Sequence, residues 1–241
     1  MYRKPPRVGG AAARAAAPAL VAAALLAGGC TADGGNMGVD PIAASPGPSV
    51  PPQIVGRELP VAVHDRPDLM DYPEMDESVP DAPYGASVLD QVTTELRRET
   101  LLMAKVYGEV TARCQGNRVV VAPDAVTSCT TTYQGVEIPW TVAMDDDVVP
   151  DSLVINFYTV QPLAELLTPQ RVQDAFYMFH SHMSDQFRCD TMPAAFRVER
   201  GTAAAHTDTG YRCQYLGLAE GGVRTWVDVP IKVTRDGGIA Y

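Results

Sequence analysis

The stretch VEIPWTV, residues 136–142, decides the fold that the sequence predicts. Every second residue is apolar, as on a β-strand with one buried face, yet Pro139 stands in its middle. The stretch VDVPIKV, residues 227–233, has the same order of valine, acid, β-branched residue and proline, with Pro230 at the matching place. Proline lacks the amide donor of a central strand, so both stretches suit edge strands. Their repetition about ninety residues apart indicates one small fold unit present twice.

A helix and further strands precede the first of these stretches. Ser87 can cap a helix, and apolar residues recur behind it at helical spacing as far as Met103. Strand patterns separated by turn residues follow over residues 109–133, and they carry Cys114 and Cys129. A helix followed by antiparallel strands is an α+β arrangement.

The second half repeats this order before its own proline stretch. Thr168 can cap a helix, and Pro169 suits the first helical position. Strand patterns around Cys189 and Cys213 lead to a Gly-Gly turn and then to residues 227–233. The sequence therefore predicts an α+β fold of two tandem small modules, each one helix packed on a short antiparallel sheet with one disulfide.

These patterns also give the expected module boundaries. The first module is predicted at residues 87–150, and the second, divergent module at residues 151–241. The stretch VINFYTV, residues 154–160, has the composition of a strand. The sequence leaves open which of the two sheets it joins.

Residues 1–29 have the organisation of a secretory signal peptide. Basic residues come first, and the uncharged apolar run that follows is shorter than a membrane span. The end of this region, LLAGGC, resembles the lipobox of bacterial lipoproteins. The resemblance implies that Cys30 is the first residue of the mature chain and carries fatty acyl groups such as palmitate. The alternative is an ordinary signal peptide followed by an unrelated cysteine.

Residues 30–86 are predicted to be a disordered tether that begins at the lipidated Cys30. The stretch 31–86 contains ten of the twenty prolines and ten acidic residues, with Arg57 and Arg66 as its only bases. Such a composition buries too little apolar surface to offset the entropy of ordering. Its acidic run DYPEMDESVPD, residues 71–81, is expected to be a solvated spacer, with a calcium or partner site as the alternative.

The negative charge of the chain excludes nucleic acid as a partner. The whole chain has a formal charge of −10; removal of residues 1–29 takes four basic residues and no acid, which leaves 15 Lys and Arg against 29 Asp and Glu, or −14. Such a surface repels nucleic acid and anionic lipid headgroups. We therefore expect an exported protein held on the outer face of the cytoplasmic membrane through the lipid on Cys30.

The cysteine count agrees with export. Five cysteines are present, and assigning Cys30 to lipid leaves four in an oxidising compartment. Four cysteines allow three disulfide connectivities. The repeated order favours the local pairing of Cys114 with Cys129 and of Cys189 with Cys213.

The order of helix, cysteines and proline-containing strand resembles the DUF4333 family of actinobacterial exported proteins. That family has a helix, V-x-x-x-C, a second cysteine, and a glycine-turn hairpin that ends in a proline-containing strand. The residues that carry the resemblance are Val110 to Cys114, Cys129, Gly135 and 136–142 in the first module, and Cys189, Cys213 and 227–233 in the second. The resemblance implies a small disulfide-bonded α+β domain on a lipoprotein or membrane protein, and it implies no activity.

No pattern of residues predicts catalysis, a cofactor or a metal. The sequence has no G-x-S-x-G turn, no C-x-x-C pair and no glycine-rich phosphate loop. His180 and His182 are two residues apart in the predicted helix and point in different directions, and the aspartates at 145–147 lack the spacing of a calcium loop. Trp140 and Trp226 are expected in the core or on a sheet face, with an exposed ligand-binding pair as the alternative.

The sequence does not name a biochemical function. The first expectation is a lipid-anchored protein of the cell envelope, without enzymatic activity, that acts as a binding or scaffolding module for an unidentified protein partner. The alternative is a regulatory module, an inhibitor or a chaperone-like domain for a secreted enzyme, which rests on analogy of fold alone.

Overall fold

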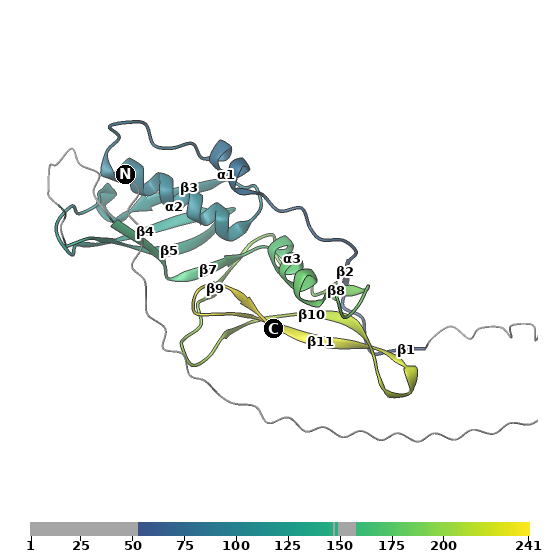
Figure 1. Ribbon diagram of the computed structural model, residues 1–241. Helices are drawn as coiled ribbons and strands as arrows, with labels where there is room; N and C mark the ends of the chain where they lie inside the picture. Colours follow the sequence, from purple (N-terminus) through teal and green to yellow (C-terminus); the bar gives the residue numbers. More distant parts are fainter. Residues whose placement is uncertain (1–52, 147, 149–157) are drawn as a thin grey trace, which may run out of the picture. The chain divides into compact units, whose positions relative to one another are not determined.

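The computed structural model describes residues 53–146, 148 and 158–241 (Figure 1). Within these ranges the chain forms α-helices and several β-sheets, so the predicted α+β class is confirmed. The helices are α1 (Tyr72–Ser78), α2 (Val88–Ala104) and α3 (Pro169–His180). None of the described helices is long and apolar enough to cross a membrane. The predicted signal peptide and Cys30 lie outside the described residues.

The first sheet contains four antiparallel strands in the order β3-β4-β5-β6. They are β3 (Val110–Cys114), β4 (Val126–Tyr133), β5 (Val136–Met144) and β6 (Tyr158–Pro162). Alternate residues of β4 and β5 are buried, as expected for strands with one covered face. Helix α2 covers that face (Figure 1), and the stretch that opened the sequence analysis forms the first seven residues of β5.

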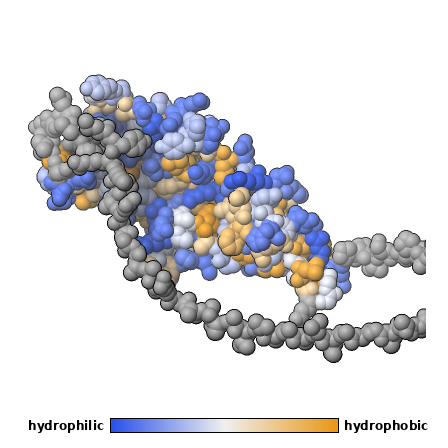
Figure 2. Space-filling view, viewed as in Figure 1, coloured by the Kyte–Doolittle hydropathy of each residue, from blue (hydrophilic) through white to orange (hydrophobic). Residues whose placement is uncertain are grey.

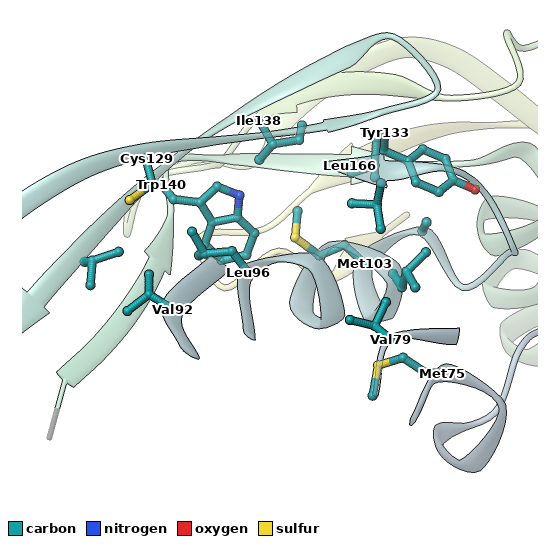
Figure 3. Packing of buried hydrophobic residues seen from close by; sticks show 14 of the residues in the cluster. Met75, Val79, Val92, Leu96, Met103, Cys129, Tyr133, Ile138, Trp140 and Leu166 are labelled. Carbon is teal, nitrogen blue, oxygen red and sulfur yellow. The ribbon is translucent and has the colours of Figure 1, made fainter. Parts of the chain in front are cut away.

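The core of this unit lies between α2 and β5. Leu96 of α2 and Ile138 and Trp140 of β5 are at most 2% exposed, and they lie together in Figure 3. The indole Nε1 of Trp140 donates a hydrogen bond of 2.9 Å to the hydroxyl of Thr131, which also receives one of 2.9 Å from Thr100. The buried indole is therefore satisfied within the core, as buried polar groups require.

Helix α2 begins and ends for local reasons. The Ser87 hydroxyl accepts a hydrogen bond from the backbone N–H of Asp90, so the predicted cap is confirmed. The helix ends at Lys105, which adopts the left-handed conformation with a φ of 58°. The Lys105 N–H still donates to the carbonyl of Leu101, which completes the last turn.

The second large sheet has the order β1-β11-β10-β8-β2, with β12 paired to β11. Its strands are β1 (Ile54–Val55), β2 (Val61–Val63), β8 (Phe187–Cys189), β10 (Thr207–Leu218), β11 (Arg224–Val233) and β12 (Ile239–Ala240). Thr168 caps α3 and Pro169 begins it, as predicted. The helix buries Val172 and Phe176 in the cluster that also contains Ile231 of β11. A third sheet pairs β7 (Ala164–Leu167) with β9 (Phe196–Glu199).

Both disulfides join directly opposite residues of neighbouring antiparallel strands. Cys114 on β3 is bonded to Cys129 on β4, and Cys189 on β8 is bonded to Cys213 on β10. This is the local pairing that the repeated order favours. In the chain-entropy description, loops of these lengths stabilise a fold by about 3–3.5 kcal/mol each.

The strand predicted near residues 154–160 joins the first sheet. Its described part begins at Tyr158, and β6 pairs in antiparallel register with β5. The first sheet therefore extends past the expected boundary at residue 150. Residues 149–157, which contain the rest of the predicted strand, lie outside the described residues.

The expectation that Pro139 lies on an edge strand is wrong. Strand β5 has β4 on one side and β6 on the other. The pairing of β5 with β6 ends at Trp140, which lies opposite Pro162. Pro139 lies one residue beyond this pairing, and its carbonyl accepts a hydrogen bond from the N–H of Leu163. Pro230 lies between the two stretches of β11 that pair with β1 and β12. Pro139 therefore lies just beyond the end of the β5–β6 pairing, and Pro230 lies in the gap between β1 and β12.

The prediction of a disordered tether over residues 30–86 is wrong for its C-terminal part. Residues 54–55 and 61–63 are strands of the second sheet, and residues 72–78 form α1. Met75 and Val79 are each 1% exposed against α2. The composition is poor in apolar residues on average, but Val63 and Met70 are buried as well, at 5% and 8% exposure.

Residues 56–60 form a strap across the second sheet. The preceding strand β1 pairs with β11 near one edge, and the following strand β2 pairs with β8 at the other edge (Figure 1). Gln214, which is 4% exposed, accepts from the N–H of Leu59 at 2.9 Å and donates to the carbonyl of Arg57 at 3.0 Å. Since Gln214 alternates with the core residue Cys213, the strap covers the face opposite α3.

A buried ion network joins elements that are far apart in the sequence. Glu165 of β7 is 1% exposed, and its two carboxylate oxygens lie 2.6 Å from Arg171 Nη1 and 2.8 Å from Arg200 Nη2. Arg171 also donates to the carbonyl of Met103, at the end of α2, and to that of Gly237, in the turn before β12. The network fixes α2, α3 and the C-terminal turn to one another.

We expect Gly237→Ala to disrupt this network. Gly237 has a φ of +83°, and an added Cβ would overlap the Glu165 carboxylate. Gly135→Ala is the matched control, because Gly135 has a φ of +84° and an added Cβ there meets nothing. Urea unfolding should show that Gly237→Ala loses at least about 2 kcal/mol more stability than Gly135→Ala. Equal losses would mean that the carboxylate moves aside without cost.

Gln214→Ala should release the strap. The substitution leaves the Leu59 N–H and the Arg57 carbonyl without their partner, at about 1–3 kcal/mol for each buried group that water does not reach. We expect faster proteolytic cleavage within residues 56–60 and a lower unfolding midpoint. Gln161→Ala, at an exposed position of β6, should change stability by less than about 0.5 kcal/mol. Unchanged cleavage would contradict the assignment of Gln214 as the residue that holds the strap.

Candidate functional site

A groove lies along α2, bordered by α1 and by residues 81–87. It encloses a cavity of about 930 Å³ and is open to solvent. We call it the α2 groove. Residues 81–88 and one side of α2, including Glu95, Glu99 and Leu102, line it together with Tyr72 and Tyr158. Its size falls at the upper end of the range of ligand pockets.

The floor of the groove is one stripe of α2. Val88, Gln91, Glu95, Glu99 and Leu102 all line it, and their spacing of three or four residues places them on one side of the helix. From Val88 to Leu102 the stripe rises by fourteen residue steps, or about 21 Å at 1.5 Å per residue. Apolar side chains lie at its two ends and the carboxylates lie near its middle.

The two carboxylates in the floor are partly removed from water. Burial raises the pKa of Glu99, and the negative charge of Glu95 raises it further. The phenol of Tyr158 is hydrogen-bonded to Glu95, and burial, followed by this bond, raises the pKa of Tyr158 well above its ordinary value. The groove therefore holds two acidic groups whose charges repel each other.

The one arginine among the lining residues is already engaged. Arg98 forms ion pairs with Asp81 and Asp76, and its Nε donates to the carbonyl of Val79 at 2.7 Å. These bonds attach α2 to the segment that borders the groove. No ion pair joins Glu95 or Glu99 to a basic residue among the described residues, so the two acidic groups in the floor are not neutralised there.

The rim carries exposed aromatic side chains. Tyr84 is fully exposed and Tyr72 is 61% exposed, and both line the groove. Elsewhere the visible face is largely hydrophilic, with apolar side chains in separate patches (Figure 2). Exposed tyrosines beside unneutralised carboxylates are typical of a binding surface rather than of a spacer.

The histidines considered in the sequence analysis do not form a ligand site. His180 is 4% exposed and packs between Phe176, Tyr215 and Tyr241. Burial lowers the pKa of His180, although the Phe176 carbonyl partly opposes that change. The helix ends at His180, so His182 lies in the following turn. Within the described residues no three His, Cys, Asp or Glu side chains are placed to hold a metal ion.

The two tryptophans have different surroundings. Trp140 lies in the core between α2 and β5. Trp226 on β11 is half-buried, with the Arg188 guanidinium 5.9 Å from its ring centre and the strap residue Gly56 close to its Cβ. They do not form a shared exposed pair. Asp145 and Asp146 are exposed, and Asp147 lies outside the described residues.

Sequence reasoning missed the groove because it missed α1. The composition of residues 71–81 predicts a solvated spacer, but Asp71 and Glu74 form a reciprocal capping box with hydrogen bonds of 2.9 Å. The same spacing of a cap and an acidic partner predicts α2 correctly at Ser87. The pattern D-Y-P-E was therefore a usable signal for α1.

Comparison with family models, curated proteins and solved structures finds no match.

Replacement of Glu99 should reveal the repulsion in the groove. Because the folded state raises the pKa of Glu99, it binds that proton more tightly than the unfolded chain, and the stability contribution of Glu99 falls as pH rises above its ordinary pKa of 4.5. Glu99→Gln should therefore stabilise the protein at pH 7, by about 0.2–0.5 kcal/mol for relief of an i, i+4 repulsion, and by less at pH 4. Thermal unfolding at both pH values measures this difference.

Glu77→Gln is the matched control for that measurement. Glu77 is exposed on α1 and does not line the groove. A stabilisation of Glu99→Gln that is the same at pH 4 and pH 7, or that Glu77→Gln reproduces, would contradict a charge effect inside the groove.

Proposed function

We propose that this chain is an exported, lipid-anchored binding protein of the cell envelope, and that the α2 groove is its binding site. The observation that carries the proposal is a solvent-open groove with two partly buried carboxylates that have no basic partner among the described residues. The exposed rim residue Tyr84 adds contact area for a partner. A partner bound there would act on the outer face of the cytoplasmic membrane.

The geometry of the groove supports binding rather than hydrolysis. Hydrolysis of a glycosidic bond by two carboxyl groups requires that they flank the bond from opposite sides. Glu95 and Glu99 project from the same side of one helix. The four described cysteines are in disulfides and supply no thiolate nucleophile. We therefore keep the expectation of a non-enzymatic protein.

We also propose that the fold arose by duplication of one module. Helix α2 is followed by β3, β4 and β5. Helix α3 is followed by β8, β10 and β11, with β9 of the third sheet between β8 and β10, and each set of three strands is adjacent in that order. A disulfide joins the first two strands of each set, and a proline lies in the third. These features support the predicted tandem modules and the resemblance to DUF4333 proteins.

The register of the two sets agrees with duplication. Cys129 lies opposite Trp140, the residue after Pro139, whereas Cys213 lies opposite Val229, the residue before Pro230. The offset between the two sets is therefore two residues. An even offset keeps every side chain on its original face, so both sets bury the same kind of positions.

The lipid on Cys30 would hold the folded part close to the membrane. The strap and its flanking strands begin at Ile54, which leaves 23 residues, 31–53, between the lipid and the first described strand. Fully extended, this stretch spans at most about 80 Å. The anchor would therefore keep Ile54, where the folded part begins, within that distance of the membrane surface.

Replacement of Cys30 tests the anchor. Cys30→Ser should move the protein from the membrane fraction to the soluble extracellular fraction, because no acyl chain then contributes about 0.8 kcal/mol per buried methylene. Mass spectrometry of the wild-type N-terminus should show an acylated cysteine at position 30. An unmodified or differently cleaved terminus would overturn the anchor.

Site-specific photocrosslinking tests the groove as the binding site. A photoreactive amino acid at position 84 should capture an envelope protein in intact cells. The same residue at position 126 is the control, since Val126 is 62% exposed on β4 and does not line the groove. Equal adducts from both positions, or none from position 84, would contradict a binding site in the groove.

A further inference from the structure

We propose that the α2 groove binds a basic peptide segment of a partner protein, with one arginine or lysine side chain between Glu95 and Glu99. The inference rests on the proposed function and adds the chemistry of the ligand. It is drawn from the charge, length and lining of the groove.

The spacing of the two carboxylates fits one cation. At positions i and i+4 of a helix their Cβ atoms are about 5–6 Å apart, so one guanidinium or ammonium group can contact both. Burial and mutual repulsion disfavour the ionised pair in the free protein, as the raised pKa of Glu99 records. A bound cation removes the repulsion in a site where partial exclusion of water strengthens the attraction.

The chain does not supply this cation from the lining of the groove. Arg98 is the one basic residue among the described lining residues, and its guanidinium is bonded to Asp76, Asp81 and the Val79 carbonyl. Over residues 71–104 eight acidic residues stand against two basic ones, a local charge of −6. This field attracts cationic partners and repels acidic ones.

The dimensions of the groove fit a peptide rather than a small cation. Glu95 lies seven residues from Val88 and seven from Leu102, or about 10 Å from each apolar end of the floor. An extended peptide rises about 3.3 Å per residue, so six or seven residues span the stripe. A basic residue at the centre would then have apolar neighbours about three positions away on both sides.

The tyrosines of the rim suit the same occupant. Tyr72 and Tyr84 present exposed rings beside the carboxylates. Aromatic faces attract guanidinium and ammonium groups and also cover apolar side chains. Cation and aromatic recognition therefore occur in one groove, which a metal ion or a simple inorganic cation would not use.

The test uses the full mature chain with Cys30→Ser and three labelled heptapeptides. Each has acetylated and amidated ends and leucine at its first and last positions; the central residue is arginine, its neutral analogue citrulline, or glutamate. Fluorescence anisotropy at low salt should show that the arginine peptide binds at least tenfold more tightly than the citrulline peptide. The glutamate peptide should bind most weakly. Higher salt should weaken the binding of the arginine peptide.

Two double variants locate the effect. Glu95→Gln with Glu99→Gln should reduce affinity for the arginine peptide at least tenfold and leave affinity for the citrulline peptide within about twofold. Glu77→Gln with Glu109→Gln removes the same charge at exposed positions outside the groove lining and should retain most of the binding. Chemical shifts of labelled wild-type protein should change along α2 on addition of the arginine peptide.

The outcomes separate this inference from the proposed function. Equal binding of the arginine and citrulline peptides to the wild type would overturn the inference without reference to any variant. So would a dissociation constant for the arginine peptide above about 1 mM, or equal losses in the two double variants. If photocrosslinking at position 84 still captures a partner in those cases, the groove is a binding site whose ligand is not cationic. If position 84 captures nothing, the proposed function itself fails.

Discussion

The buried carboxylate of Glu165 is the constraint on which the rest of the structure depends. It lies between the guanidinium groups of Arg171 and Arg200, and a carboxylate at 1% exposure without such partners would be strongly disfavoured. Arg171 connects this charge to the end of α2 at Met103 and to the turn at Gly237. A buried ion pair adds little net stability over an apolar replacement, but loss of one member leaves the others uncompensated. The network therefore determines how these elements are arranged, because the buried charges have partners only when β7, α2, α3 and the C-terminal turn lie together.

The fixed position of α2 has a direct consequence for the groove. The C-terminal end of the helix is held through the carbonyls of Met103 and Ala104, which accept from Arg171 and Thr168. Its inner side packs on Trp140 in the core. The side chains on the groove side therefore project from a helix that is fixed both at its C-terminal end and along its core side. Side chains held in place before binding lose less entropy when a ligand arrives, which would favour the binding that we propose for the groove.

The sequence predicted the parts of the fold whose signals are local. The caps at Ser87 and Thr168 and the alternation along residues 136–142 depend on neighbours within a few positions, and they appear as expected. The groove and the strap depend on single apolar or polar residues that meet distant partners. Gln214 contacts residues more than 150 positions earlier in the chain, and no periodic pattern in the sequence predicts such a contact. The average composition of residues 31–86 does not reveal the few side chains that are buried. It therefore predicts a tether where part of the chain is folded.

The described part of residues 30–86 has two connected roles. Its early part forms the strap and closes one face of the second sheet, and its later part forms α1 and borders the α2 groove. If Cys30 carries lipid, any pull from the membrane meets β1 and the strap before it reaches α1. The bonds of Gln214 and the ion pair of Arg188 with Glu58 resist that pull. If Cys30 is lipidated as we propose, the strap would thus take up such a pull before it reaches α1 and the α2 groove.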